Sequence, residues 1–207
     1  MPDSISTATK LDAIVEKYTQ DPYTQLPRTA VIVTTSEGII YEKATGPEQV
    51  PKDPSAARKN DTTLDSIFEL WSCTKLVTTI ACLRLIEDGK LKEDDDVAKY
   101  LPEINNLKVF RGYEGDKPKL EDLNTAITVR MLMTHTLGSA LDLGDVTPEY
   151  HRYMSEVLGY AELFSVYATT DLETFKKIPL LAQPGESFMY GYALGAMQSS
   201  HHEPDHC

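Results

Sequence analysis

Ser72 and Lys75 are the two residues whose types and spacing most clearly indicate chemistry. They are three positions apart at the start of an expected helix, so their side chains share one face of its first turn. A serine hydroxyl is a weak nucleophile until a base takes its proton, and a lysine can be that base when it is neutral. Burial and the positive end of the helix dipole both favour a neutral lysine. The unpaired N–H groups of the first turn could also stabilise negative charge on an acyl oxygen.

The same pair has a simpler explanation. Serine is a good helix N-cap, and a serine three positions before a lysine arises often by chance. Taken alone, Ser72 and Lys75 therefore favour a capping serine beside a surface lysine, and the surrounding segments must decide between the two interpretations.

The segment from residue 72 to residue 88 is the most apolar long stretch of the chain. Its apolar residues cover more than one helical face, which predicts a buried helix rather than a surface helix. Gly89 follows directly, and glycine readily takes the left-handed backbone that ends many helices. The apolar positions of this helix are Leu76, Val77, Ile80, Ala81, Leu83, Leu85 and Ile86.

Charge and cysteine usage limit the partners and the compartment. The chain has 207 residues and a net charge of −12, which argues against binding to nucleic acid or to anionic membrane surfaces. Cys73 and Cys82 are nine positions apart on one helix, about 13 Å along its axis, too far for a disulfide. With Cys207 they form a sparse, odd set typical of a reducing compartment. No apolar signal segment opens the sequence, and we expect a cytoplasmic protein.

Several further elements follow from periodicity and turn residues. A β-hairpin with strands at 30–35 and 39–43 should follow an N-terminal helix. The other expected elements are a helix over 4–20, an exposed loop over 46–63, a short helix over 97–101, a polar loop over 105–124, a short helix capped by Thr128, two helices within 148–178 and a turn at 184–186.

No metal or cofactor site is expected. The acidic run at residues 93–96 lacks the ligand spacing of a calcium loop and is better explained as a solvated loop with an acidic helix cap. Residues 198–207 contain three histidines and a cysteine, which could bind a metal. The segment has no periodicity, and we expect a disordered tail.

Three segments that match in order indicate a family. They are residues 68–75 around Ser72, residues 127–138 with His135, and residues 183–192 with Tyr190. This series resembles the serine β-lactamase-like family, and within it the class C-like esterases and fungal acyltransferases, or transesterases, over roughly residues 5–197. The resemblance implies an α+β, β-lactamase/transpeptidase-like fold with an N-terminal hairpin and a helical region, here as a partial domain over residues 1–197.

The resemblance also implies roles for individual residues. Ser72 would be the acylated nucleophile, Lys75 would help to deprotonate it, and Tyr190 would act as general base and then acid. A tyrosine near a lysine ammonium has a stabilised phenolate, although Tyr190 alone could equally be a core aromatic residue. In the resembled family the segment around His135 is structural, so we do not expect a catalytic histidine.

Two departures from the family pattern limit these expectations. Tyr192 stands where the family's Tyr-x-Asn motif has asparagine, which fits esterases and transesterases better than β-lactamases. Nothing after Tyr192 matches the family's third motif, Lys-Thr-Gly or His-x-Gly, so we expect the C-terminal strands of the sheet to be missing and turnover to be poor.

The sequence therefore predicts a serine hydrolase or acyltransferase that forms an acyl-enzyme at Ser72 from a small-molecule ester or thioester. Two alternatives stay open. One is a truncated, non-catalytic gene product that keeps the helical core. The other is an acidic helical binding module, whose capture of a partner would survive the loss of Ser72.

Overall fold

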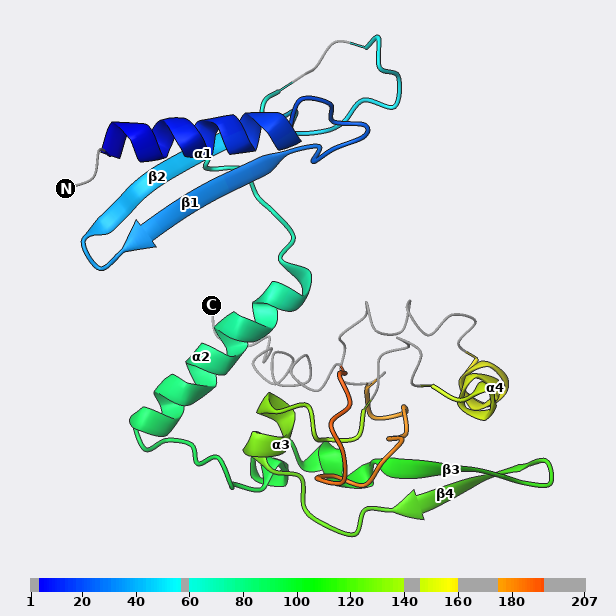
Figure 1. Ribbon diagram of the computed structural model, residues 1–207. Coiled ribbons are helices and arrows are strands. Elements are labelled where there is room, and N and C mark those ends of the chain that lie inside the picture. The colour runs from blue at the N-terminus through cyan, green and yellow to red at the C-terminus, as the bar shows by residue number, and fades with distance from the viewer. Residues whose placement is uncertain (1–3, 57–59, 140–145, 160–174, 192–207) are drawn as a thin grey trace, which may run out of the picture. The chain divides into compact units, whose positions relative to one another are not determined.

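The computed structural model describes residues 4–56, 60–139, 146–159 and 175–191 (Figure 1). The chain divides into two compact units, residues 1–69 and residues 70–207. The domain boundary expected after residue 197 lies outside the described residues and stays a prediction.

The first unit is a helix packed on a β-hairpin. Helix α1 (Ser4–Tyr18) is followed by strands β1 (Thr29–Thr35) and β2 (Gly38–Thr45), which pair antiparallel with an irregularity after Val33. Helix α1 runs along one face of this hairpin (Figure 1). The predicted helix and hairpin are thus confirmed, with boundaries that differ by one or two residues.

Ionic contacts connect α1 to β2. The Lys43 ammonium lies 2.8 Å from Asp12 and 3.0 Å from Glu16, and the Tyr41 hydroxyl donates a hydrogen bond to Asp12 at 3.0 Å. Hydrogen bonds from Lys43 and then from Tyr41 lower the pKa of Asp12. The hydrogen bonds that Lys43 makes with Asp12 and Glu16 raise the pKa of Lys43. Tyr41 and Lys43 are two positions apart on a strand, so this face of the hairpin is the one that carries the helix.

The second unit begins with the segment that carries Ser72. A short 3₁₀ turn (Trp71–Cys73) precedes α2 (Thr74–Glu87), and Gly89 has the expected left-handed backbone, with φ +70°. The cap positions are Leu70 and Cys73, and neither of them makes a side-chain capping hydrogen bond. The interpretation of Ser72 as a helix cap is therefore wrong, because the helix begins two residues later.

The expectation that this helix is buried is also wrong. Cys82 is its one buried residue among those the structure describes, whereas Leu76 and Val77 are 67% and 60% exposed. Cys82 and the partly buried Ile86 connect α2 to the core, which is built from later segments. An apolar helix is thus present, but the described residues cover only one narrow side of it.

The core of the second unit lies between short helices. It is built around the 3₁₀ turns Val97–Lys99 and Pro102–Asn106 and around α3 (Val129–Met133). Both predicted caps are confirmed, since the Asp96 carboxylate accepts from Ala98 N and the Thr128 hydroxyl accepts from Met131 N. The side chains that are at least 98% buried in this core are Ile104, Leu107, Val109, Ile127, Val129, Leu132, Leu137 and Leu180.

A second hairpin replaces the polar loop expected over 105–124. Strands β3 (Lys108–Glu114) and β4 (Lys117–Asp122) pair antiparallel. Phe110 of β3 packs in tilted or edge-on geometry on Tyr150 and Tyr153 of α4 (Pro148–Glu156). Charged residues alternate with few apolar ones here, so periodicity alone did not reveal the strands.

A later segment extends this hairpin on its other edge. Phe110 N donates to Leu180 O and Leu180 N donates to Lys108 O, both at 2.8 Å, in a parallel bridge with β3. The predicted turn at 184–186 follows, closed by a hydrogen bond from Glu186 N to Gln183 O at 3.0 Å. Backbone pairing with β3 therefore fixes the position of Leu180, ahead of the turn at 184–186.

Some expectations lie outside the described residues. They concern residues 160–174 of the predicted helical pair, Tyr192 and the tail at 198–207. Within the described ranges, no helix has the length and apolar content needed to cross a membrane.

Burial predicts different costs for two leucine truncations. Leu132→Ala removes a side chain that is 1% exposed and should lower the free energy of unfolding by about 2–5 kcal/mol. Leu76→Ala removes one that is 67% exposed and should change it by no more than about 0.5 kcal/mol. Urea unfolding followed by circular dichroism measures both. A large loss for Leu76→Ala would show that another part of the chain covers α2.

Candidate active site

The structure brings Ser72, Lys75 and Tyr190 together within the second unit. The Tyr190 hydroxyl donates to Ser72 Oγ at 2.8 Å, and the Lys75 ammonium donates to the same oxygen at 3.4 Å. Lys75 Nζ also lies 5.1 Å from the centre of the Tyr190 ring. Ser72 is exposed, while Lys75 and Tyr190 are half-buried. A serine hydroxyl thus has two hydrogen-bonding partners and remains open to solvent.

These contacts change the acidity of Tyr190. Its hydrogen bond with Ser72 lowers the pKa of the phenol, because the serine hydroxyl can become the donor once the phenol is ionised. The positive charge of Lys75 lowers it further, whereas partial burial and the nearby Cys73 act in the opposite direction. The net effect lowers the pKa of Tyr190 and so eases formation of the phenolate, the form that can accept a proton.

The backbone around Ser72 differs from expectation in one respect. Cys73 N donates to Leu70 O at 3.0 Å, and Thr74 N points at the carbonyl oxygens of Trp71 and Ser72. These two N–H groups are already paired, because a 3₁₀ turn precedes the helix. The expected anion-binding role of the first-turn N–H groups therefore does not extend to Cys73 or Thr74.

His135 supports the tyrosine and does not contact the serine in any described interaction. Its ring centre is 4.7 Å from that of Tyr190, its carbonyl oxygen accepts from Met189 N at 2.8 Å, and its Nδ1 accepts from Gly191 N at 3.5 Å. Burial, and then the charge of Lys75, lower the pKa of His135. An unprotonated Nδ1 fits this environment, because only a neutral imidazole can accept the N–H of Gly191.

Two strained backbone positions lie at this site. Among the described residues, Trp71 and His135 are the non-glycine residues with positive φ, at 47° and 56°. Such a conformation costs about 1–3 kcal/mol and persists only where the surrounding structure imposes it. Trp71 directly precedes Ser72, and His135 contacts Tyr190. The sequence gives no sign of this strain at Trp71, a bulky residue that rarely takes positive φ, whereas histidine takes it more often.

Close backbone packing holds the tyrosine segment against residues 135–139. A Cβ atom on Gly191 would lie 2.2 Å from Ser139 O, and one on Gly138 would lie 2.2 Å from Ala182 O. Leu181 N donates to Gly138 O at 2.8 Å. Glycine is thus required at both contacts, and Tyr190 has little freedom to move relative to His135.

Nothing in the described part of the chain indicates a metal centre, since no three histidine, cysteine or acidic side chains gather there. The site brings a serine, a lysine and a tyrosine together in one hydrogen-bonded group on an α+β scaffold. The chain matches the family described as Beta-lactamase over residues 9–193, and it belongs to that family.

Several curated relatives are fungal proteins named as esterases or acyltransferases. Lovastatin esterase of Penicillium rubens is 34% identical over 166 residues, which are 79% of this chain and 39% of that protein. Acyltransferase calJ of Penicillium decumbens is 29% identical over 180 residues, which are 87% of this chain and 40% of that protein. The chain thus spans about two fifths of the length of these relatives.

Solved structures show the same fold. Unliganded simvastatin synthase (LovD) of Aspergillus terreus aligns with a TM-score of 0.72 at 23% identity, over 97% of this chain and 49% of that one. EstCE1, described as a hydrolase with promiscuous acyltransferase activity, aligns with a TM-score of 0.67 at 24% identity, over 95% of this chain and 46% of that one. The expected β-lactamase/transpeptidase-like fold is confirmed.

The environment of Tyr190 predicts how its phenol titrates. Its pKa should lie below the usual value of about 10, and Ser72→Ala and Lys75→Met should each raise it, because each removes a group that stabilises the phenolate. Ultraviolet difference titration, with Tyr190→Phe to assign the signal, measures this shift. A pKa that stays the same in both variants would contradict the contacts described here.

His135 predicts a loss of stability on mild acidification. Its folded pKa is lowered, so above pH ~6.5 neither state binds the proton and its contribution is constant. Below pH ~6.5 the unfolded state takes up the proton first, and stability should fall until the folded pKa is passed. His135→Asn, which tolerates positive φ and does not titrate, should flatten this part of the profile.

The measurement is the free energy of unfolding between pH 7.5 and pH ~5. Asp95, whose pKa is lowered to about 2 by hydrogen bonds from Lys99 and Tyr100, loses its contribution only at lower pH. If the free energy of unfolding of His135→Asn falls with pH as steeply as that of the wild type, His135 is not the source of the loss.

Proposed function

We propose that this protein is a serine hydrolase or acyltransferase that forms an acyl-enzyme on Ser72 from a small-molecule ester or thioester. The contact of Ser72 Oγ with both Tyr190 Oη, at 2.8 Å, and Lys75 Nζ, at 3.4 Å, carries this proposal. Serine, lysine and tyrosine are nucleophile, cation and base in one hydrogen-bonded group, and no cofactor is needed for acyl transfer.

The proposed acylation step is a proton transfer coupled to attack. The Tyr190 phenolate takes the proton of Ser72 while Oγ forms a bond to the acyl carbon. The ester or thioester bond then breaks, and the leaving alcohol or thiol receives the proton from Tyr190. Lys75 remains an ammonium and stabilises the charge that develops between the two oxygens. Attack by water or by an acceptor alcohol reverses the sequence and frees Ser72.

The choice of an ester over another acyl donor rests on similarity. The curated relatives are named lovastatin esterase and acyltransferases, and these names carry the substrate class to this chain only as a proposal. Trp71 and Phe188 are 64% and 69% exposed, and Phe188 packs edge-on against His135. Exposed aromatic surface on Trp71, next to Ser72 in the chain, and on Phe188, which packs on His135, suits an acyl group with apolar carbon.

The location and the other partners rest on the sequence. The sparse cysteines, of which Cys73 and Cys82 are free thiols, support the proposal of a cytoplasmic protein. The acidic net charge of −12 supports the prediction that the partner is neither nucleic acid nor an anionic membrane.

Labelling with a fluorophosphonate tests the proposal without requiring turnover. We expect one adduct per chain by intact mass, located on Ser72 by peptide mapping and absent in Ser72→Ala. Lys75→Ala and Tyr190→Phe should each slow labelling by about 10²-fold, because each removes a part of the proton-transfer group. If Lys75 and Tyr190 act as one unit, the labelling rate of the double variant should be considerably higher than the product of the two single effects predicts.

Cys73 provides the internal control, since it is an exposed thiol next to Ser72. An adduct on Cys73 with Ser72 unmodified, or wild-type labelling in Tyr190→Phe, would contradict the proposed mechanism. Loss of labelling in Cys73→Ala would point to the same conclusion.

A further inference from the structure

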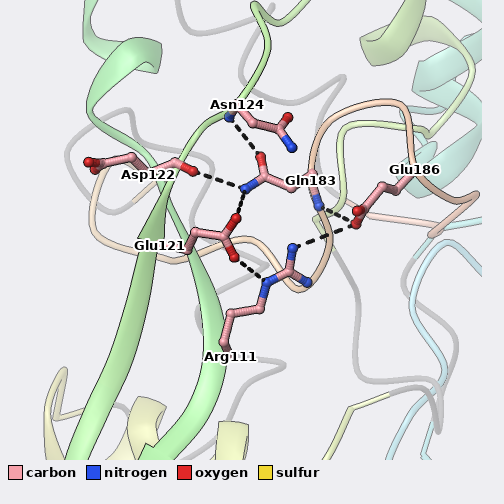
Figure 2. Close-up of polar contacts among 6 residues, drawn as sticks. All are labelled: Arg111, Glu121, Asp122, Asn124, Gln183 and Glu186. Carbon is pink, nitrogen blue, oxygen red and sulfur yellow. Dashed lines mark hydrogen bonds and ion pairs between the residues drawn. The ribbon is translucent and has the colours of Figure 1, made fainter.

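Gln183 has a buried amide that is fully engaged. It is 1% exposed, and its Nε2 donates to Glu121 Oε1 and to Asp122 O, both at 2.9 Å (Figure 2). Its Oε1 accepts from Asn124 N at 3.0 Å. A single side chain from the last described segment thus connects to the end of β4 and to the residues after it, about sixty positions earlier in the chain.

Charged neighbours fix the orientation of this amide. Arg111 Nε donates to Glu121 Oε2 at 2.7 Å, and Gln183 N donates to Glu186 Oε2 at 2.9 Å (Figure 2). Arg111, and then Gln183, lower the pKa of Glu121. A charged carboxylate accepts hydrogen bonds only, so the NH₂ group of Gln183 must face Glu121 and its oxygen must face Asn124.

The backbone transmits this position toward Tyr190. Beyond Gln183, Gly185 N donates to Thr136 O at 2.7 Å and Met189 N donates to His135 O at 2.8 Å. Tyr190 follows immediately, with its ring on His135. Three contacts therefore anchor the segment that ends in Tyr190: the Gln183 amide and the backbone hydrogen bonds of Gly185 and Met189. Of these three, the Gln183 contact is the one made by a buried side chain.

We propose that Gln183 is a positioning residue for Tyr190, and this role rests on the proposed function of Tyr190 at Ser72. Its amide fixes the start of the 183–191 segment against β4, so that the phenol reaches hydrogen-bonding distance of Ser72 Oγ. Gln183 touches no reacting atom and acts only through Tyr190.

The chemistry of the amide is specific. Methionine has a similar shape, but it would leave Asn124 N, Glu121 and Asp122 O without their buried partner, so the segment should move to restore these hydrogen bonds through solvent. Glutamate would place a second carboxylate oxygen at the 2.9 Å separation from Glu121, where like charges repel. Neither substitution changes the groups that face Tyr190, which are Ser72, Lys75, Cys73 and His135.

Two readouts test the proposal in the 207-residue chain. In Gln183→Met the pKa of Tyr190, measured by difference titration, should return toward its ordinary value, because the phenol moves away from Ser72 and Lys75. Fluorophosphonate labelling of Ser72 should slow roughly 10- to 100-fold, since small misplacements of a reacting group reduce rates to this extent. The ascending limb of the pH–rate profile, which reports ionisation of the phenol to the base form, should shift to higher pH together with the pKa of Tyr190.

A matched variant separates positioning from general destabilisation. Ile104→Val truncates a core side chain that is 1% exposed and should lower the melting temperature without changing the pKa of Tyr190 or the labelling rate. Gln183→Glu should be slow, and Glu121→Gln combined with Gln183→Glu should recover part of the rate and of the pKa shift, because the exchanged amide and carboxylate can pair again.

The outcomes distinguish this inference from the proposed function. Wild-type labelling and an unchanged Tyr190 pKa in Gln183→Met would overturn the inference while the proposed function stands. A Tyr190 pKa that rises in Gln183→Met, in a protein whose Ser72 is never labelled, would overturn the proposed function and support the positioning role. Equal effects in Ile104→Val and Gln183→Met would also overturn the inference.

Discussion

The proposed chemistry of the site depends on the hydrogen bond between Tyr190 and Ser72, and this bond depends on the packing around it. It joins residues 118 positions apart in the sequence, and a hydrogen bond of this kind contributes only about 1 kcal/mol. That is too little to offset the entropy of bringing such distant segments together. The core of the second unit must therefore hold the two segments in place, and the hydrogen bond reports their position without determining it.

The two sides of this hydrogen bond are held differently. The tyrosine side lies on a segment with backbone hydrogen bonds to Lys108, Gly138, Thr136 and His135, and with glycine contacts that leave no space for a Cβ atom. The serine side lies at the start of α2, of which only Cys82 is buried among the described residues. Positioning is therefore strongest for the proposed base, and the nucleophile depends on the strained turn at Trp71 and on few packing contacts.

The sequence predicts local features better than distant ones. Ser72 and Lys75 could be paired from spacing alone, because residues three positions apart on a helix lie on the same face. Tyr190 could be added only through the resemblance to a family, since no pattern within the chain relates positions 72 and 190. The hairpin of β3 and β4 could not be predicted from periodicity because its residues are largely charged. Its connection to the site is the hydrogen bond between Gln183 and the end of β4, which joins residues about sixty positions apart. The sequence predicts burial of α2 because an apolar helix needs a partner to cover it. Its composition does not say what that partner is, and the described residues do not supply it.

The charge of Lys75 connects the remaining features of the site. It adds to the Ser72 hydrogen bond in lowering the pKa of Tyr190, and to burial in lowering the pKa of His135, so the same ammonium eases formation of the phenolate and disfavours the imidazolium. The neutral imidazole is the form whose Nδ1 accepts the N–H of Gly191, directly after the tyrosine. A protonated His135 would lose this acceptor and place a second positive charge beside Lys75. The lysine therefore acts twice, once on the acidity of the proposed base and once on the side chain that supports its ring. For this reason a lysine at position 75 matters to the geometry of Tyr190 as well as to its charge.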